Sequence, residues 1–208
     1  MEYLLEKLVV GPIAVNCYIL ADKGTKEAAV IDPGDEADAI LLTMAKMKVR
    51  AKYVLLTHAH VDHVAALKSI VQTMGAQLLM HKADSLMLKT APAQALAFGL
   101  KISIPPKADR YVDDGDEIEL GAMKIKVLHT PGHSGGCVCY AVDGMLFVGD
   151  TLFAGSIGRT DLPGGSYEDL IEGVRTKLFA YDDKTMVYPG HGPETTIGNE
   201  KKYNPFFA

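Results

Sequence analysis

The sequence predicts an α+β protein in which two mixed β-sheets are flanked by helices. The chain has 208 residues, of which 48% are hydrophobic and 23% charged, so it can bury one sizeable core. Each half of the chain reads as several strands followed by helices. Strict alternation of strands and helices, which would favour a doubly wound parallel sheet, is not seen. We therefore expect one domain that covers residues 1–208.

Apolar runs bounded by turn residues predict five strands in the first half. They lie at Leu4–Val10, Cys17–Ala21, Ala28–Ile31, Tyr53–Leu56 and Gln77–Met80. Apolar residues at helical spacing predict one helix that starts at Asp35 and another over residues 64–74, ended by a glycine. Residues 83–99 alternate small and apolar types around Pro92, which favours two short helices. Residues 104–106 are irregular and could cover a cleft.

The second half is expected to be richer in strands. They lie at Glu117–Leu120, Met123–Leu128, Cys137–Val142, Met145–Val148 and Thr185–Tyr188. The pair Asp143-Gly144 is the best short hairpin signal in the chain. A Gly-rich loop follows at 155–165. Ser166, with Asp169 three residues later, resembles a capping box and predicts the start of a helix. A short terminal helix is expected after the last strand.

Charge and cysteine content narrow the range of functions. The net charge of −5 argues against a general nucleic-acid binder, which needs a basic surface. No apolar run approaches the ~18–20 residues of a membrane span, and the charged first ten residues do not fit a secretory signal. Cys137 and Cys139 are too close along one strand to form a disulfide readily, and Cys17 reads as a core residue. We therefore expect a cytoplasmic protein with no nucleic-acid or membrane partner.

The densest group of chemically active side chains is Thr57-His58-Ala59-His60-Val61-Asp62-His63. It follows the apolar run that ends at Leu56, so it lies in the loop at the carboxyl end of a buried strand. The first two histidines are two residues apart and can point the same way from an extended segment. A solvated loop with Asp62 as a helix N-cap accounts poorly for three histidines in a chain of seven. The segment predicts metal binding and can supply two neighbouring sites.

Three more candidate ligands stand in the same setting, after an apolar run and beside a glycine. They occur in Gly132-His133, Gly149-Asp150 and Gly190-His191. Glycine at these places permits turns and close backbone approach. If the four loops meet at one sheet edge, they bring together seven ligands: His58, His60, Asp62, His63, His133, Asp150 and His191. Seven ligands suit two metal ions that share a carboxylate.

This ordered set of ligands resembles the metallo-β-lactamase superfamily, and within it the small glyoxalase II-like hydrolases. The resemblance spans essentially the whole chain, and the ligand motif is highly specific. It implies an αββα sandwich with the site at one edge. It also implies the distribution of the ligands: His58, His60 and His133 on one metal, Asp62, His63 and His191 on the second, and Asp150 as the bridge.

The resemblance predicts a dinuclear thioester hydrolase for compounds of the hydroxyacylglutathione type. Two metals about 3.5–4 Å apart can bind a bridging hydroxide, because coordination brings the pKa of water toward 7. We expect that hydroxide to attack the thioester carbonyl while a thiolate leaves. Asp150 would bridge the metals and Asp62 would orient the nucleophile. We expect two divalent ions per chain, zinc first, with iron or manganese as alternatives, since His/Asp sites accept all three.

Other residues have two interpretations each. Arg159 matches the basic glutathione-contacting position of glyoxalase II-like enzymes, but it could instead pair with Asp161. His129, at a strand end, is expected to support the ligands rather than bind metal, and His81 to be structural. Glyoxalase II itself has a C-terminal helical domain, whereas this chain stops at Ala208. With two expected tyrosines also replaced, by Asp161 and Pro193, glutathione as part of the substrate is an open question.

Rival functions remain. Persulfide dioxygenases share this fold resemblance and would use one iron held by His58, His133 and Asp150, with open positions for oxygen. A β-lactamase is disfavoured by the lack of a secretion signal and by the bridging aspartate. A nuclease is disfavoured by the acidic charge. A homodimer is conceivable, with the irregular segment 83–112 as its interface.

Overall fold

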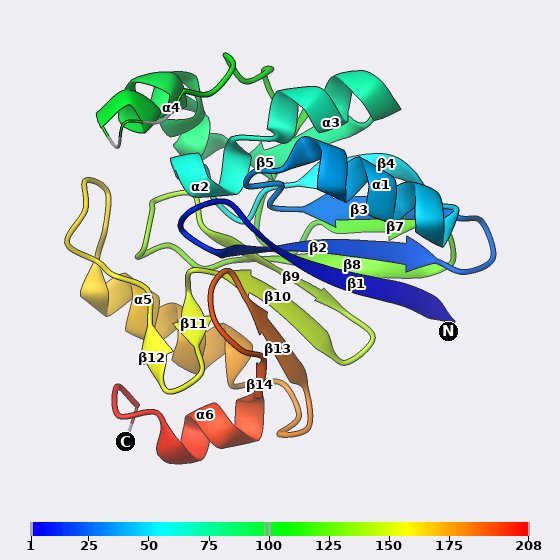
Figure 1. The fold of residues 1–208 in the computed structure, drawn as a ribbon. Coiled ribbons are helices and arrows are strands. Elements are labelled where there is room, and N and C mark those ends of the chain that lie inside the picture. The colour runs from blue at the N-terminus through cyan, green and yellow to red at the C-terminus, as the bar shows by residue number, and fades with distance from the viewer. Residues whose placement is uncertain (1, 98, 100, 208) are drawn as a thin grey trace.

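The computed structural model describes residues 2–97, 99 and 101–207 and has the expected α+β architecture. Two mixed six-stranded sheets form the middle of the molecule. Helices α1, α3 and α4 cover the outer face of one sheet, and α5 and α6 cover the outer face of the other (Figure 1). The protein is therefore the αββα sandwich that the sequence predicts.

The first sheet has the strand order β1-β2-β3-β4-β5-β6. Its strands are β1 (Tyr3–Val10), β2 (Val15–Asp22), β3 (Glu27–Ile31), β4 (Arg50–Leu55), β5 (Gln77–His81) and β6 (Arg110–Val112). The first three are antiparallel, and β3 to β6 run parallel. Parallel neighbours need crossover connections, which here contain α1 (Ala37–Met47), α2 (Val61–Val64), α3 (Leu67–Met74) and α4 (Ser85–Ala97). The sequence interpretation did not include β6, which has only three residues.

The second sheet has the order β14-β13-β10-β9-β8-β7. Its strands are β7 (Glu117–Leu120), β8 (Met123–His129), β9 (Val138–Val142), β10 (Met145–Gly149), β13 (Met186–Pro189) and β14 (Thr195–Thr196). Only β10 and β13 are parallel, and the chain between them contains α5 (Tyr167–Gly173) and a π-helical turn, η2 (Val174–Leu178). A small hairpin of β11 (Leu152–Phe153) and β12 (Ser156–Ile157) leads into the Gly-rich loop, and α6 (Ile197–Tyr203) follows β14.

Two of the local signals are found as predicted. Asp143 and Gly144 both have positive φ, 45° and 75°, as a tight hairpin turn between antiparallel strands requires. The Ser166 side chain accepts a hydrogen bond from the backbone N–H of Asp169 and caps α5.

The helix predicted over residues 64–74 is interrupted. Ala65 and Ala66 separate α2 from α3, because their N–H groups donate to the carbonyls of Gly34 and Pro33. These tertiary hydrogen bonds fasten the start of α3 to the loop after β3. The signal is invisible in the sequence, because the two partners are about thirty residues apart.

The expectation of two short helices around Pro92 is wrong, because α4 is continuous from Ser85 to Ala97. A proline inside a helix lacks the N–H for the carbonyl one turn earlier. Leu88 and Ala95, on either side of the proline, are both buried, so the two halves stay on one surface.

The apolar side chains form three layers. One lies between the first sheet and its helices, one between the two sheets, and one between the second sheet and α5, η2 and α6. All three cysteines are free and buried. Cys17 belongs to the first layer and Cys139 to the third. Within the described part of the chain, no helix combines the length and apolar character that a membrane span requires.

Candidate metal centre

Four loops meet at one edge of the sandwich, and they come from both sheets. The loop after β4 supplies His58 and His60, and α2, which follows it directly, supplies Asp62 and His63. The loops after β8, β10 and β13 supply His133, Asp150 and His191 respectively. The structure therefore brings together all seven side chains that the sequence suggested as ligands.

Their facing atoms fall into two groups. His58, His60 and His133 form one group, and Asp62, His63 and His191 form the other, with the ligand atoms of each group within 4.8 Å of one another. In the first, Nδ1 of His60 lies 2.9 Å from Nε2 of His133. In the second, Oδ2 of Asp62 lies 3.1 Å from Nε2 of His191.

Asp150 lies between the two groups. Its Oδ1 is 3.4 Å from Nε2 of His63, and its Oδ2 is 3.6 Å from Nε2 of His133 and 3.7 Å from Nε2 of His191. One carboxylate thus faces both sets of imidazoles. This is the arrangement that a carboxylate shared by two cations would have.

Buried polar atoms without partners mark the same place. Among the residues that the structure describes, three such side-chain atoms occur: Nε2 of His58, Nε2 of His63 and Oδ1 of Asp150. Buried polar groups normally have hydrogen-bond partners, because an unsatisfied one costs about 1–3 kcal/mol. All three atoms face the centre, so the donor set fits bound cations.

The opposite nitrogen of most of the histidines is fixed by an outer partner. Nδ1 of His133 donates to the carbonyl of Arg159 over 2.7 Å, and Nδ1 of His191 donates to the carbonyl of Ala14 over 3.3 Å. Thr57 Oγ1 gives its own proton to Asp32, so it accepts from Nδ1 of His58. A neutral imidazole that donates from Nδ1 has its lone pair on Nε2. These contacts therefore turn the metal-binding lone pairs inward.

Comparisons with known proteins agree with this geometry. A profile described as the metallo-beta-lactamase superfamily matches residues 10–191. The chain belongs to this superfamily. An uncharacterized protein of Mycobacterium tuberculosis is 40% identical over 94% of each chain. The hydroxyacylglutathione hydrolase GloC of Haemophilus influenzae is 37% identical over 97% of each chain.

Solved structures give the same family. BLEG-1, described as a B3 metallo-beta-lactamase, has a TM-score of 0.92 and 35% identity, over 99% of this chain and all of that one. TTHA1623 in a di-iron-bound form has a TM-score of 0.88 and 36% identity, over 97% of this chain and 99% of that one. ETHE1 from Myxococcus xanthus has a TM-score of 0.83 and 28% identity, over 97% and 83%. Relatives of this member of the superfamily therefore carry several different names.

Asp32 supports the centre from below, and the sequence interpretation missed this role. It is 2% exposed and follows β3. Its Oδ1 accepts from the N–H of Thr57, and its Oδ2 accepts from the Thr57 hydroxyl and faces Nδ1 of His63 at 3.0 Å. Asp32 thus orients His63 directly and His58 through Thr57. Both oxygens are occupied on the side away from the centre, so Asp32 is a positioning residue.

Asp84 and Asn16 hold the remaining loops. The carboxylate of Asp84 accepts from the N–H of Ala59, the hydroxyl of Ser134 and the N–H of Gly136, so it joins the loops that carry His58 and His133. The side chain of Asn16 donates to the carbonyls of Pro189 and Gly192 on either side of His191. In the sequence Asp84 and Asn16 belong to no recognisable motif, because their hydrogen-bond partners lie 25 to 176 positions away.

Burial sets the protonation of two histidines of the first group, His58 and His60. Burial, together with His63 and His133, lowers the pKa of His58 well below its usual range. Burial and His133 lower the pKa of His60 to about 4. Both rings are therefore neutral near pH 7. A neutral imidazole offers the lone pair that a metal ion requires.

The second group carries more negative charge. Burial opposes a charge on His63, but Asp150 and Asp32 outweigh it and raise the pKa of His63 well above its usual range. Burial favours the neutral form of Asp62 and raises its pKa, but His191 and His63 outweigh burial and keep the pKa of Asp62 below its usual range. The carboxylates of Asp62 and Asp150 lie beside the imidazoles of His63 and His191, so this group attracts a cation. Such a cation would replace the proton on His63.

Two glycines make room for side chains of the centre, one beside Asp150 and one beside Thr57. A Cβ on Gly190 would collide with Oδ1 of Asp150 and come within 2.8 Å of His63. A Cβ on Gly149 would collide with Thr57, and Gly149 also has a positive φ of 50°. Glycine beside the ligands is therefore a steric requirement of the centre at these two positions.

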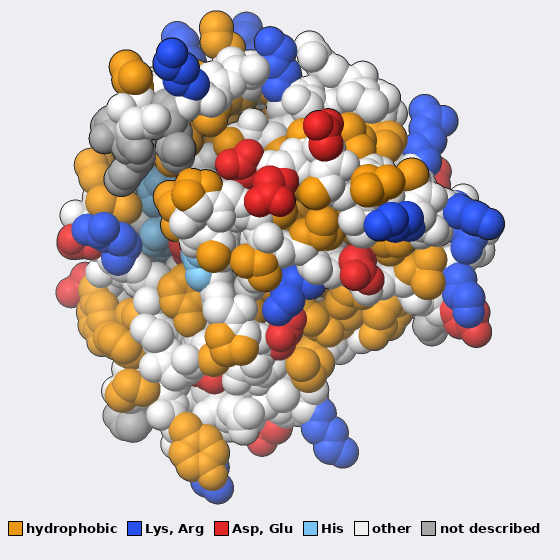
Figure 2. Space-filling model, viewed as in Figure 1, with side chains coloured by type: hydrophobic (Ala, Val, Ile, Leu, Met, Phe, Trp, Pro, Cys, Tyr) orange, Lys and Arg blue, Asp and Glu red, His pale blue; other side chains and the backbone are white. Residues whose placement is uncertain are grey.

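The centre opens into a cavity of about 550 Å³. His60, Asp62, His133, Asp150 and His191 form its floor, while Ile13, Val61, Met87, Leu162 and Pro163 form apolar walls and Arg159 and Gln94 add polar groups. In Figure 2, histidine side chains are visible in a hollow on the left of the molecule, with hydrophobic side chains around it. Such a concave, largely apolar site above polar groups is typical of small-molecule binding.

Arg159, His129 and His81 lie near the centre but outside the two groups. The guanidinium of Arg159 binds both carboxylate oxygens of Asp161, over 2.8 and 2.7 Å. His129 donates from Nε2 to the carbonyl of Gly135, in the loop that carries His133. His81 stacks on His129 with a centroid distance of 4.1 Å and an angle of 16°. Asp113 lies near these two rings. The lone pair of an imidazole nitrogen lies in the plane of its ring, and one ion cannot lie in the planes of two stacked rings at once. His81 and His129 therefore do not bind one ion together with Asp113.

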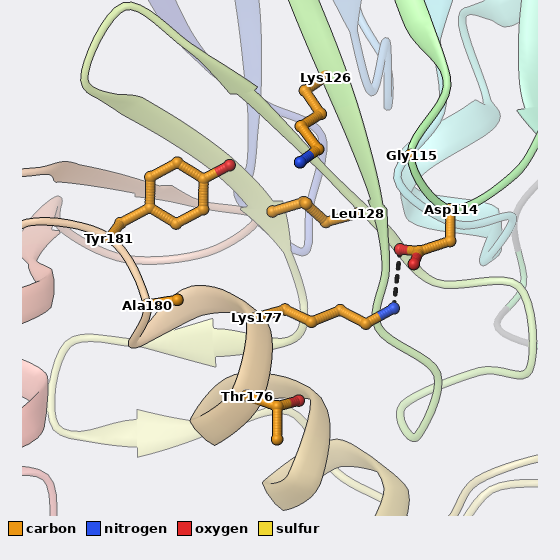
Figure 3. A pocket seen from close by; sticks show the side chains of 8 residues that line it. All are labelled: Asp114, Gly115, Lys126, Leu128, Thr176, Lys177, Ala180 and Tyr181. Carbon is orange, nitrogen blue, oxygen red and sulfur yellow. Dashed lines mark hydrogen bonds and ion pairs between the residues drawn. The ribbon is translucent and has the colours of Figure 1, made fainter.

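A second cavity of about 400 Å³ lies between β8 and the end of the α5–η2 segment (Figure 3). Lys177 pairs with Asp114 there over 2.7 Å and also donates to the carbonyl of His129. Asp114 accepts from the N–H of His129. These contacts fix the end of β8, from which the chain continues to His133. The residues that line this cavity therefore help to hold the loop that carries His133. None of them belongs to the seven-residue cluster.

Proposed function

We propose that this protein is a dinuclear metal-dependent hydrolase that cleaves thioesters. The observation that carries the proposal is the position of Asp150 between two groups of three ligands, where three buried polar atoms lack partners. We assign one cation to His58, His60 and His133, a second to Asp62, His63 and His191, and the bridge to Asp150.

Two divalent cations held there would activate water as a nucleophile and polarise the thioester carbonyl. The protein supplies the geometry around that chemistry. Asp32 and Thr57 fix two of the histidines, so the donors are arranged before any ion or substrate arrives. Asp62 lies at the cavity floor and is placed to orient the attacking water. The apolar walls exclude competing solvent, and a thiolate leaves without a general acid.

The thioester bond is favoured by the likeness to GloC, whose name is hydroxyacylglutathione hydrolase. A small-molecule thioester is therefore the partner that we propose. Zinc is the first candidate for both ions, and TTHA1623 in its di-iron-bound form makes iron the second. A cytoplasmic location, the absence of nucleic-acid and membrane partners, and a homodimer stay predictions.

The proposal is tested by counting metals per chain and then assaying S-lactoylglutathione hydrolysis. We expect about two metals per chain and hydrolysis that a chelator removes and added metal restores. Asp62→Ala should lose one metal and hydrolysis. A metal count of two with hydrolysis unchanged in Asp62→Ala would contradict the assignment of the second group.

Hydrolysis of β-lactams is a second candidate, because BLEG-1 is described as a B3 metallo-beta-lactamase and is 35% identical over almost the whole chain. The same donor set can activate water against an amide. The metallated protein should be assayed with a chromogenic cephalosporin beside the thioester. Faster turnover of the cephalosporin would replace the thioester proposal.

The iron dioxygenase predicted as an alternative from the sequence needs only His58, His133 and Asp150. The same metal count distinguishes this dioxygenase from the dinuclear hydrolase. One iron per chain, with oxygen uptake on glutathione persulfide and no thioester hydrolysis, would favour it. In that case Asp62→Ala should keep its iron.

A further inference from the structure

The walls of the active-site cavity differ sharply from its floor. Five of the seven ligand side chains lie at the floor, whereas the walls are formed by the aliphatic side chains of Ile13, Met87 and Leu162 and by Pro163. Ile13 is 43% exposed although it is a large aliphatic residue. Apolar surface kept open beside a reactive centre indicates what the bound molecule covers.

The charge at the rim points the same way. Among the described residues that line the cavity, Arg159 is the one lysine or arginine. Asp161 holds its guanidinium with two hydrogen bonds of 2.8 and 2.7 Å. Lys201, a basic residue near the carboxyl end, is paired with Asp183 over 2.7 Å and does not line the cavity. An anionic substrate therefore meets a cation that is already neutralised.

The charge at the rim and the apolar contact with the walls differ in size. Arg159 and Asp161 are both more than half exposed, so solvent screens both charges and Asp161 weakens the attraction for an anion only severalfold. Each methylene removed from water against an apolar wall strengthens binding about fourfold. A few methylenes on the substrate therefore outweigh the rim charge.

We propose that the cavity selects uncharged thioesters with an apolar acyl chain, and that Asp161 lowers the affinity for anionic thiol carriers by neutralising Arg159. This inference rests on the proposed thioester hydrolysis and names its substrate class. The acyl chain lies along Met87 and Leu162 while the carbonyl reaches the floor. Arg159 and Asp161 remain paired at the rim.

The first test is a chain-length series on one neutral carrier. Acetyl, butyryl and hexanoyl thioesters of N-acetylcysteamine share the reacting bond and differ only in apolar length. We expect kcat/KM to rise about fourfold per methylene until the wall is covered. Leu162→Ser should flatten this rise, whereas Leu42→Ser, a similar change at an exposed leucine on α1, should leave it unaltered. A flat series in the wild-type protein would overturn the proposal.

The second test isolates the charge. Lactoyl N-acetylcysteamine and S-lactoylglutathione carry the same acyl group on a neutral and an anionic carrier. We expect the neutral ester to have the higher kcat/KM. Asp161→Asn should raise kcat/KM for the glutathione ester about two- to fivefold, mainly through KM, and added salt should shrink this gain. Asp183→Asn, which frees Lys201 far from the rim, is the matched control and should change neither ester.

The outcomes separate the two proposals. If the protein with its full metal complement hydrolyses none of these thioesters, the proposed function itself fails. If it hydrolyses S-lactoylglutathione faster than the neutral ester and Asp161→Asn has no effect, thioester hydrolysis stands but the substrate class is wrong. A rising neutral series together with a gain from Asp161→Asn supports both.

Discussion

At the scale of single residues, the centre depends on side chains that do not face it. Asp32 is the strongest case, because its two oxygens fix Thr57 and His63 at once. Replacing it by asparagine exchanges an acceptor for an NH₂ group that opposes the N–H of His63 or the Thr57 hydroxyl. Partners of this kind typically change metal affinity by about 10- to 100-fold.

We therefore predict that Asp32→Asn weakens metal binding by about 10- to 100-fold while the fold is retained. Competition with a chromogenic chelator measures the affinity, and circular dichroism checks the fold. Asp38→Asn, an exposed aspartate in the first turn of α1, is the control. Equal metal affinity in Asp32→Asn and Asp38→Asn would show that Asp32 has no positioning role.

Gly190 gives a second prediction at this scale. A methyl group there would occupy the place of the Asp150 carboxylate. Gly190→Ala should therefore lose metal and activity. Gly192, two residues later, has a positive φ of 77° but open space around it, so Gly192→Ala should lose about 1 kcal/mol of stability and keep its metal. Metal analysis and thermal unfolding of the pair separate a steric effect from backbone strain.

At the scale of elements, the start of α5 is hydrogen-bonded to the loop that carries His133. The Ser166 hydroxyl caps the helix. The backbone N–H of Ser166 donates to the carbonyl of Gly132, the residue before His133. The cap therefore stabilises both the helix and the approach to a ligand. Helix α5 also lies on the third apolar layer, through Leu170.

We predict that Ser166→Ala lowers stability by about 1 kcal/mol, which corresponds to a Tm decrease of about 2–4 °C in a chain of this size. Ser166→Asp should restore most of the loss, because aspartate caps helices equally well. Differential scanning calorimetry compares the three proteins. A Tm of Ser166→Asp equal to that of Ser166→Ala would mean that the cap hydrogen bond is not responsible.

At the scale of the whole molecule, the middle layer joins the two sheets. Phe147 of the second sheet packs on Tyr18 of the first, with ring centroids 5.2 Å apart, and stacks on Tyr188. Ligands also come from both sheets. We propose that residues 1–208 form one folding unit, since neither sheet can bury its inner face without the other.

The prediction is that Phe147→Ala lowers the free energy of unfolding by about 3–5 kcal/mol and lowers amide protection in both sheets together. Hydrogen exchange with peptide resolution measures each sheet separately. The conservative variant Phe147→Leu should show a smaller, equally shared loss. A loss of protection limited to β7–β14 would indicate two folding units.

Much of this organisation could be predicted from local signals. Apolar runs that end in glycine or proline turns gave the long strands, and ligands that follow such runs gave the seven candidates. Asp32, Asp84 and Asn16 escaped, because their roles depend on hydrogen bonds to residues 25 to 176 positions away. A sequence shows such a residue only as one more polar side chain near a turn.

The errors have related causes. Tertiary hydrogen bonds to Ala65 and Ala66 interrupt the helix expected over residues 64–74. Burial on both sides of Pro92 keeps α4 continuous against the local preference of proline. The short strands β6, β11, β12 and β14 have too few residues for a periodic pattern. In the first two cases, long-range contacts outweigh a local tendency.

The buried cysteines have a practical consequence. Burial raises the pKa of Cys139 to about 11 and that of Cys17 higher still, so neither thiol reacts readily with an alkylating reagent while the protein is folded. Cys17 and Cys139 lie in the two outer apolar layers, on opposite sides of the molecule. Pulsed alkylation followed by mass spectrometry can therefore time the opening of each layer separately, with no engineered probe.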